Sequence, residues 1–150
     1  MKGGKELEDA LVELVKIYGP KSMSNIFNVP IKKAMQGMLQ EITSNTPVDS
    51  GDLKESVKLK VGKPSKSRRS QAKSVDETTA AEGRVGWWWS KGSGVNSHEA
   101  LAVEFGTQTR GAQPVLRRAL KSGAGGAVQV LRKEVGLSLD KTSKRLAKKK

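Results

Sequence analysis

The hydrophobic residues of this 150-residue chain change their spacing partway along it, from a helical repeat to strict alternation. Between Ile31 and Ile42 the apolar side chains recur every three or four residues, which predicts an amphipathic helix. Residues 57–61 (VKLKV) alternate apolar and basic side chains instead, the pattern of a strand with one buried and one wet face. A second, antiparallel strand is predicted over residues 84–89 (RVGWWW), with Trp87 and Trp89 on one face and Trp88 on the other. So little strand sequence allows only a small sheet, which helices must cover.

Helical patterns precede this pair of strands. One helix is predicted over residues 7–18, and a second follows Pro30, which suits a first-turn position, and ends at residues 46–47. In the next segment, Asp49 or Ser50 is expected to cap a short helical turn.

The chain after the strands is less regular. Residues 97–105 fit either a short helix or a strand, which Gly106 ends in both cases. A helical turn is predicted after Pro114, but residues 122–126 (SGAGG) contain three glycines that weaken a continuous helix. A separate last helix is predicted over residues 128–135.

Two stretches are strongly basic. Residues 58–73 hold seven basic residues and no acidic one, and we interpret residues 62–80 as a long, mobile, basic hairpin loop. Residues 141–150 hold six basic residues and are expected to fray. The predicted fold is therefore α+β, with a small antiparallel sheet packed with N-terminal and C-terminal helices. It forms one domain over residues 1–140, followed by a basic tail at 141–150.

Composition argues against an enzyme. The chain has no cysteine and a single histidine, His98, so thiol chemistry, Cys-ligated metals and most histidine-based sites are excluded. Asp49 and Asp52 are too few to cage a cation, which favours helix capping for them. We predict no catalytic residue, no metal and no cofactor.

No apolar run is long enough to span a bilayer, and residues 1–10 (MKGGKELEDA) contain acidic side chains where a signal peptide would be apolar. This pattern predicts a soluble protein without a membrane partner, made in the cytoplasm. A sheet of two or three strands also leaves open edges, which are commonly covered by a neighbouring subunit.

Three segments in this order carry a family resemblance: residues 46–56 (TPVDSGDLKES), 102–107 (AVEFGT) and 113–120 (QPVLRRAL). With them, the chain resembles the minor tail component, or tail-completion, family of long-tailed bacteriophages, named after the tenth gene product of a lambdoid phage. The resemblance implies a non-enzymatic structural protein of the virion neck, assembled in the host cytoplasm. It implies tail completion or head-to-tail joining by a ring oligomer, a hexamer, that connects the tail tube to the head connector.

The partners implied are further copies of the chain, a head connector or stopper protein, and a tail terminator or tail tube protein. The family motifs and the open sheet supply the candidate interface residues: Asp49, Gly51, Leu53, Ser56, Trp88, Glu104, Phe105, Gly106, Thr107, Pro114, Leu116, Arg117 and Arg118. If residues 102–107 are extended, Val103 and Phe105 fill the core while Glu104 points away. Glu104 is then free to pair with Arg117 or Arg118, within or between subunits.

The net charge of +13 leaves a second function open, a small basic nucleic-acid-binding protein. Its candidate contacts, to phosphate or to an acidic partner, are Lys63, Lys66, Arg68, Arg69, Lys144, Arg145 and Lys148. These residues allow non-specific contact with genomic DNA, although a solvated loop is the simpler interpretation of residues 62–80. For the tail at residues 141–150, an acidic neighbouring ring is the favoured partner. The three tryptophans could stack on bases, but core and interface packing is favoured.

Overall fold

The structure is a computed structural model that describes residues 24, 26–49, 51–71, 79, 81–89 and 97–147. The helix predicted over residues 7–18 lies outside them. Residues 26–34 are helical, and after them come α2 (Gln36–Asn45), α3 (Asp52–Glu55), β1 (Val57–Gly62), α4 (Lys66–Gln71), β2 (Glu82–Trp87), α5 (Ser97–Phe105) and α6 (Val115–Ala147). Helices combined with a small antiparallel sheet confirm the predicted α+β fold.

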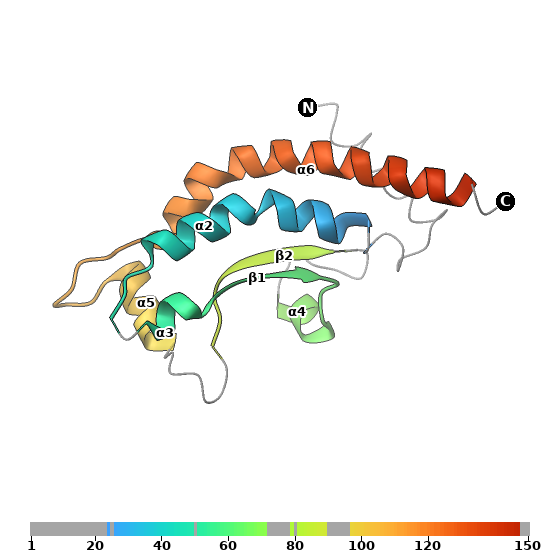
Figure 1. The fold of residues 1–150 in the computed structure, drawn as a ribbon. Coiled ribbons are helices and arrows are strands. Elements are labelled where there is room, and N and C mark those ends of the chain that lie inside the picture. The colour runs from blue at the N-terminus through green and yellow to red at the C-terminus, as the bar shows by residue number, and fades with distance from the viewer. Residues whose placement is uncertain are drawn as a thin grey trace, which may run out of the picture.

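The described elements form layers (Figure 1). α6 runs along α2, α2 packs against both strands, and α4 lies on the far side of the sheet. The strands pair antiparallel, with Val57 opposite Trp87 and Gly62 opposite Glu82. Burial alternates along β1 as predicted, since Lys58 and Lys60 are exposed and the apolar residues between them are half-buried. β2 begins two residues earlier than predicted and ends at Trp87.

The core lies where α2, α3, the end of β2, α5 and the start of α6 meet. Trp87 is 8% exposed, and its indole N–H donates to the Oγ1 atom of Thr46 at 3.1 Å, so the polar edge of the ring is satisfied inside the protein. The other buried members of this cluster are Ile42, Leu53, Ala100, Val103, Val115 and Ala119.

Pro30 corrects one prediction, because it lies inside the helical segment 26–34 and not in a first turn. Proline has no N–H, so the carbonyl of Ile26 loses the donor that a helix normally provides four residues later. The hydroxyl of Ser138 on α6 donates to that carbonyl oxygen at 2.9 Å instead. A tertiary hydrogen bond thus makes up for the missing helical one.

α6 is continuous over 33 residues, which corrects the predicted break at residues 122–126 and the predicted separate last helix. Gly123 explains part of the difference. A Cβ atom at this position would lie 2.5 Å from the Cγ atom of Met38, so glycine is what lets α6 approach α2. α6 also continues to Ala147, so residues 141–147 are helical and no element ends at the predicted boundary after residue 140.

Residues 66–71 form α4, where a loop was predicted. The Oγ atom of Ser65 accepts the backbone N–H of Arg68 at 3.2 Å, an N-cap that composition alone does not reveal. Arg68 also pairs with Glu82 on β2 at 3.4 Å, which ties the helix to the sheet. Residues 72–78 and 80 of the predicted loop lie outside the described part of the chain. Within that part, no helix combines the length and apolar character needed to cross a membrane.

Candidate interaction groove

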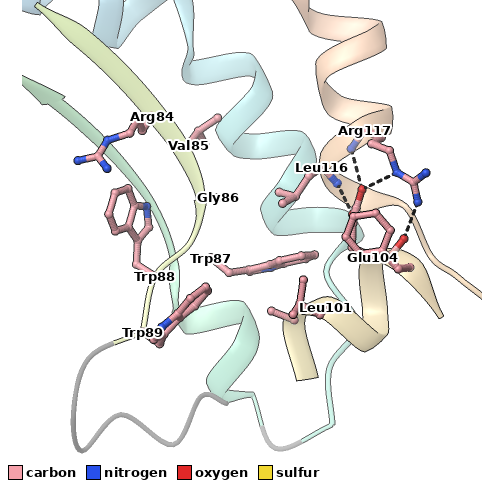
Figure 2. A pocket seen from close by; sticks show the side chains of 12 residues that line it. Arg84, Val85, Gly86, Trp87, Trp88, Trp89, Leu101, Glu104, Leu116 and Arg117 are labelled. Atoms are coloured by element: carbon pink, nitrogen blue, oxygen red, sulfur yellow. Dashed lines mark hydrogen bonds and ion pairs between the residues drawn. The ribbon is translucent and has the colours of Figure 1, made fainter. Parts of the chain in front are cut away.

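An open groove of about 800 Å3 lies between β2, α5 and the start of α6 (Figure 2). β2 forms one wall, and Leu101 of α5 and Leu116 of α6 form the other. Trp87 points across the groove from β2 toward these two leucines. The groove is therefore bounded by the side of β2 that does not pair with β1.

The backbone of β2 faces this groove in a defined register. The N–H of Trp88 donates to the carbonyl oxygen of Ser56 at 2.9 Å, which makes Ser56 and Trp88 a hydrogen-bonded pair. In an antiparallel ladder such pairs alternate, so Gly86 and Arg84 bond across to β1 while Trp87 and Val85 direct their backbone groups away from it. In the sheet of the described residues β2 neighbours β1 alone, so these groups face the groove.

The groove exposes large apolar side chains. Leu101 is 54% exposed and Phe105 is 63% exposed, and they lie one helical turn apart on α5. Trp89, just beyond β2, is 54% exposed and lines the same groove. Contiguous exposed apolar surface of this kind is typical of protein–protein contact sites.

Glu104 closes the corner between α5 and α6. Its carboxylate accepts the backbone N–H of Leu116 at 2.9 Å and that of Arg117 at 3.1 Å, so it caps the first turn of α6. The Arg117 side chain donates to the same carboxylate from Nε at 3.0 Å, and from Nη2 to the Glu104 carbonyl oxygen at 2.7 Å. The predicted pairing of Glu104 is thus made with Arg117, within one chain. Arg118 is exposed on the next position of α6.

Phe105 corrects another prediction. It was expected in the core beside Val103, but residues 97–105 are helical, and two residues on a helix are about 200° apart. Val103 is therefore buried with Glu104, and Phe105 faces outward with the Arg117 guanidinium 5.0 Å from its ring centroid.

Gly106 and Thr107 form the turn after α5. α5 ends at Phe105, so the predicted end of this segment at Gly106 is confirmed. Gly106 has a φ of +80°, and a Cβ atom there would lie 2.8 Å from the backbone nitrogen of Ala112, so the turn requires glycine. The Oγ1 atom of Thr107 accepts the N–H of Arg110 at 3.0 Å. Pro114 directly precedes α6, as predicted, and its carbonyl accepts the N–H of Arg118.

The first motif segment lies behind the groove. Leu53 is buried in the core, and the Ser56 hydroxyl donates to the Leu53 carbonyl at 2.7 Å. The N-cap of α3 is Gly51, in the left-handed region at a φ of +92°, and not the predicted Asp49 or Ser50. Asp49 is exposed, and Ser50 lies outside the described residues. All three motif segments therefore build one corner of the molecule.

The other predicted residues lie at the margin of the groove or away from it. Trp88 lines the groove, but its side chain is on the opposite side of β2 from Trp87, as expected from alternation. Trp89 does not share the burial of Trp87. Lys63, Lys66, Arg68 and Arg69 belong to α4 and the segment before it, and Lys144 is exposed on α6. The Arg145 side chain and Lys148 lie outside what the structure describes.

Leu101 is one of several groove residues, with Val85 and Trp89, that the candidate interface predicted from the sequence does not contain. Its spacing of four from Phe105 would have placed both on one helix face, had the segment been assigned as helix. Glu104 is the carboxylate lining the groove, and the helix cap already engages it. Among the described residues, no three His, Asp or Glu side chains lie close enough to hold a metal ion. The exposed apolar side chains of the groove and the free side of β2 are features that suit contact with polypeptide.

Comparisons with models of known protein families, with curated proteins and with solved structures find no match for this chain.

Proposed function

We propose that this chain is a structural subunit of a bacteriophage neck, which completes the tail or joins it to the head as a ring of copies. The single observation that carries the proposal is that the free side of β2 opens onto an apolar groove. A subunit of a closed ring needs two different, complementary patches, one on each side. The groove supplies one of them.

The chemistry of the groove fits the addition of an extended segment from the next subunit. Backbone groups of Val85 and Trp87 are directed toward it and provide a ladder for a further strand. Leu101 and Phe105 provide apolar contacts beside that ladder. An uncovered strand edge next to apolar surface is a liability in a monomer, and subunit contact removes it.

The resemblance supports the same assignment. The three segments that resemble the tail-completion family pack around this corner, although 67 positions separate Pro47 from Pro114 in the sequence. Under this proposal the ring faces a head connector or stopper on one side and a tail terminator or tail tube on the other. It performs no turnover and is located in the virion.

The proposal is tested by native mass spectrometry and negative-stain imaging of the purified protein. The expected result is a closed ring. The double variant Leu101→Glu/Phe105→Glu places two charges in the groove and should give monomers with an unchanged circular dichroism spectrum. The matched control is Val128→Glu/Leu137→Glu, which changes two exposed apolar residues of α6 and should leave the ring intact.

A wild-type protein that stays monomeric at all concentrations, alone and with isolated tails, would contradict the proposal. If Leu101→Glu/Phe105→Glu still forms a ring, the proposed ring is supported, but the groove is not part of the contact between subunits.

A further inference from the structure

The face of the sheet opposite α2 carries a second surface, which meets the groove at Arg84 and Trp88. The strand register places Lys58 opposite Gly86 and Lys60 opposite Arg84, and all four positions share one face. Figure 2 shows Arg84 and Trp88 projecting from the side of β2 away from Trp87. Three cations and one aromatic ring are thus gathered on a short ribbon, and we refer to Lys58, Lys60, Arg84 and Trp88 as the basic face.

Trp88 orders the cations of the basic face. The Nζ atom of Lys60 lies 3.8 Å from the centroid of its ring, and the Cζ atom of Arg84 lies 4.7 Å from it. The indole N–H donates to the Lys58 carbonyl oxygen at 3.0 Å and fixes the ring on β1. The two charged groups are therefore held in place before any partner arrives, which lowers the entropic cost of binding.

The positive charge continues beyond the ribbon. Glu82 is the one carboxylate within residues 57–71 and 81–88, against seven Lys and Arg. Arg84 contacts it at 3.1 Å and Arg68 of α4 at 3.4 Å, so the carboxylate is neutralised locally. Lys63, which precedes α4, and Lys66, its first residue, are exposed. Positive charge thus follows the chain from β1 through residues 63–66 into α4.

We propose that the basic face binds the phosphate backbone of double-stranded DNA without reading its sequence. A linear track of cations neutralises the evenly spaced charges of a duplex. Two-stranded ribbons are also of a size that the major groove admits. This inference does not depend on ring formation.

An acidic protein is a less suitable partner. Protein interfaces need an apolar centre, and the large apolar residues that are exposed among the described residues lie on other elements than β1, α4 and β2. Single-stranded nucleic acid is also disfavoured, because a base that stacked on the Trp88 ring would compete with the two cations that already contact it. The structure therefore favours duplex phosphate.

The test measures the affinity for a short DNA duplex by fluorescence anisotropy between about 50 and about 200 mM salt. The variant Lys58→Gln/Lys60→Gln/Arg84→Gln should reduce the slope of log K against log salt by about 0.9 for each phosphate that is no longer neutralised, which is about 3 in total. The control Lys121→Gln/Arg132→Gln/Lys133→Gln removes the same charge from exposed positions of α6 and should change the slope by less than about 1.

Equal effects of the two triple variants would overturn the proposal, because net charge and not the basic face would then set affinity. Absence of duplex binding by the wild-type protein would overturn it as well. Tighter binding of single strands than of duplex, or displacement of DNA by poly-glutamate of equal charge at equal concentration, would assign the face to another partner.

Trp88 gives an independent readout. Trp88→Ala should lower duplex affinity several-fold at low salt while all cations remain, whereas Trp88→Phe keeps a ring and should retain most of the affinity. The circular dichroism spectrum of the alanine variant shows whether it is folded, and its affinity counts only if it is. If it unfolds, the affinity of the phenylalanine variant is the measurement that tests the role of the ring. The double variant Lys58→Gln/Lys60→Gln leaves the groove lining unchanged and should still form the ring in native mass spectrometry, as should the α6 control. Failure of DNA binding and failure of assembly are therefore distinguishable.

Discussion

The hydroxyl of Ser138 donates a hydrogen bond to the carbonyl oxygen of Ile26 at 2.9 Å. Within the helix this oxygen would accept the N–H of residue 30, which Pro30 lacks. Ile26 is buried, so its carbonyl has little access to water. The hydrogen bond therefore connects the far half of α6 to the start of the described chain, and it exists because of a proline 108 positions away from Ser138.

This relationship predicts coupling between Ser138 and Pro30. Ser138→Ala should lower the free energy of unfolding by about 1–2 kcal/mol, since a buried carbonyl is left without its partner. In the Pro30→Ala background, the introduced alanine restores the helical N–H, and the same serine change should cost less than half as much. Urea denaturation of the four proteins measures the cycle. Equal costs in both backgrounds would show that the serine does not replace the missing bond.

Glu104 and Arg117 should contribute unequally to stability. Glu104→Ala leaves two backbone N–H groups at the start of α6 without an acceptor and should cost about 2–3 kcal/mol. Arg117→Ala removes an ion pair whose cationic side is 58% exposed, and should cost less than about 1 kcal/mol. Chemical denaturation of both variants tests the order. A larger cost for the arginine would mean that the ion pair, and not the cap, holds this corner.

The glycines of α6 should respond in opposite directions to alanine. Gly123→Ala forces a Cβ atom against Met38 and should destabilise the protein by about 1–3 kcal/mol. Gly125→Ala meets nothing within 4 Å and should stabilise it by about 0.5–1 kcal/mol through helix propensity. Thermal unfolding of the two variants measures the contrast. If both alanine substitutions stabilised the protein, the Cβ atom at position 123 would not meet Met38, and α6 would have to lie farther from α2 than the structure shows.

Proline substitutions in β2 should separate folding from assembly. At Val85 the backbone N–H points away from β1, so Val85→Pro should preserve the β1–β2 pairing and prevent addition of a further strand. Arg84→Pro removes a bond of the existing ladder and should disrupt the hairpin itself. Circular dichroism measures whether each variant is folded, and native mass spectrometry measures whether it forms the ring. A Val85→Pro protein that still forms rings would show that subunits join without strand addition.

The sequence alone determined the features that depend on local pattern. Alternation over residues 57–61 predicted the one-sided strand, the helical repeat from Ile31 to Ile42 predicted the helix that covers it, and Gly106 predicted the turn. The pairing of Glu104 with Arg117 was also among the alternatives. Each of these follows from periodicity or from the chemistry of residues close in the chain.

Tertiary structure decided the rest. Three glycines within five residues weaken a helix in isolation, but α6 continues through them because Gly123 packs on Met38. Pro30 lies within a helix because Ser138, on another element, satisfies the carbonyl it leaves free. Phe105 is exposed because its segment is a helix that buries Val103 and Glu104 instead. In the first two cases a contact between residues distant in sequence outweighs a local preference of about 1 to 3 kcal/mol, and such contacts do not appear in spacing or composition. In the third, the spacing allowed both a helix and a strand, and packing selected the helix.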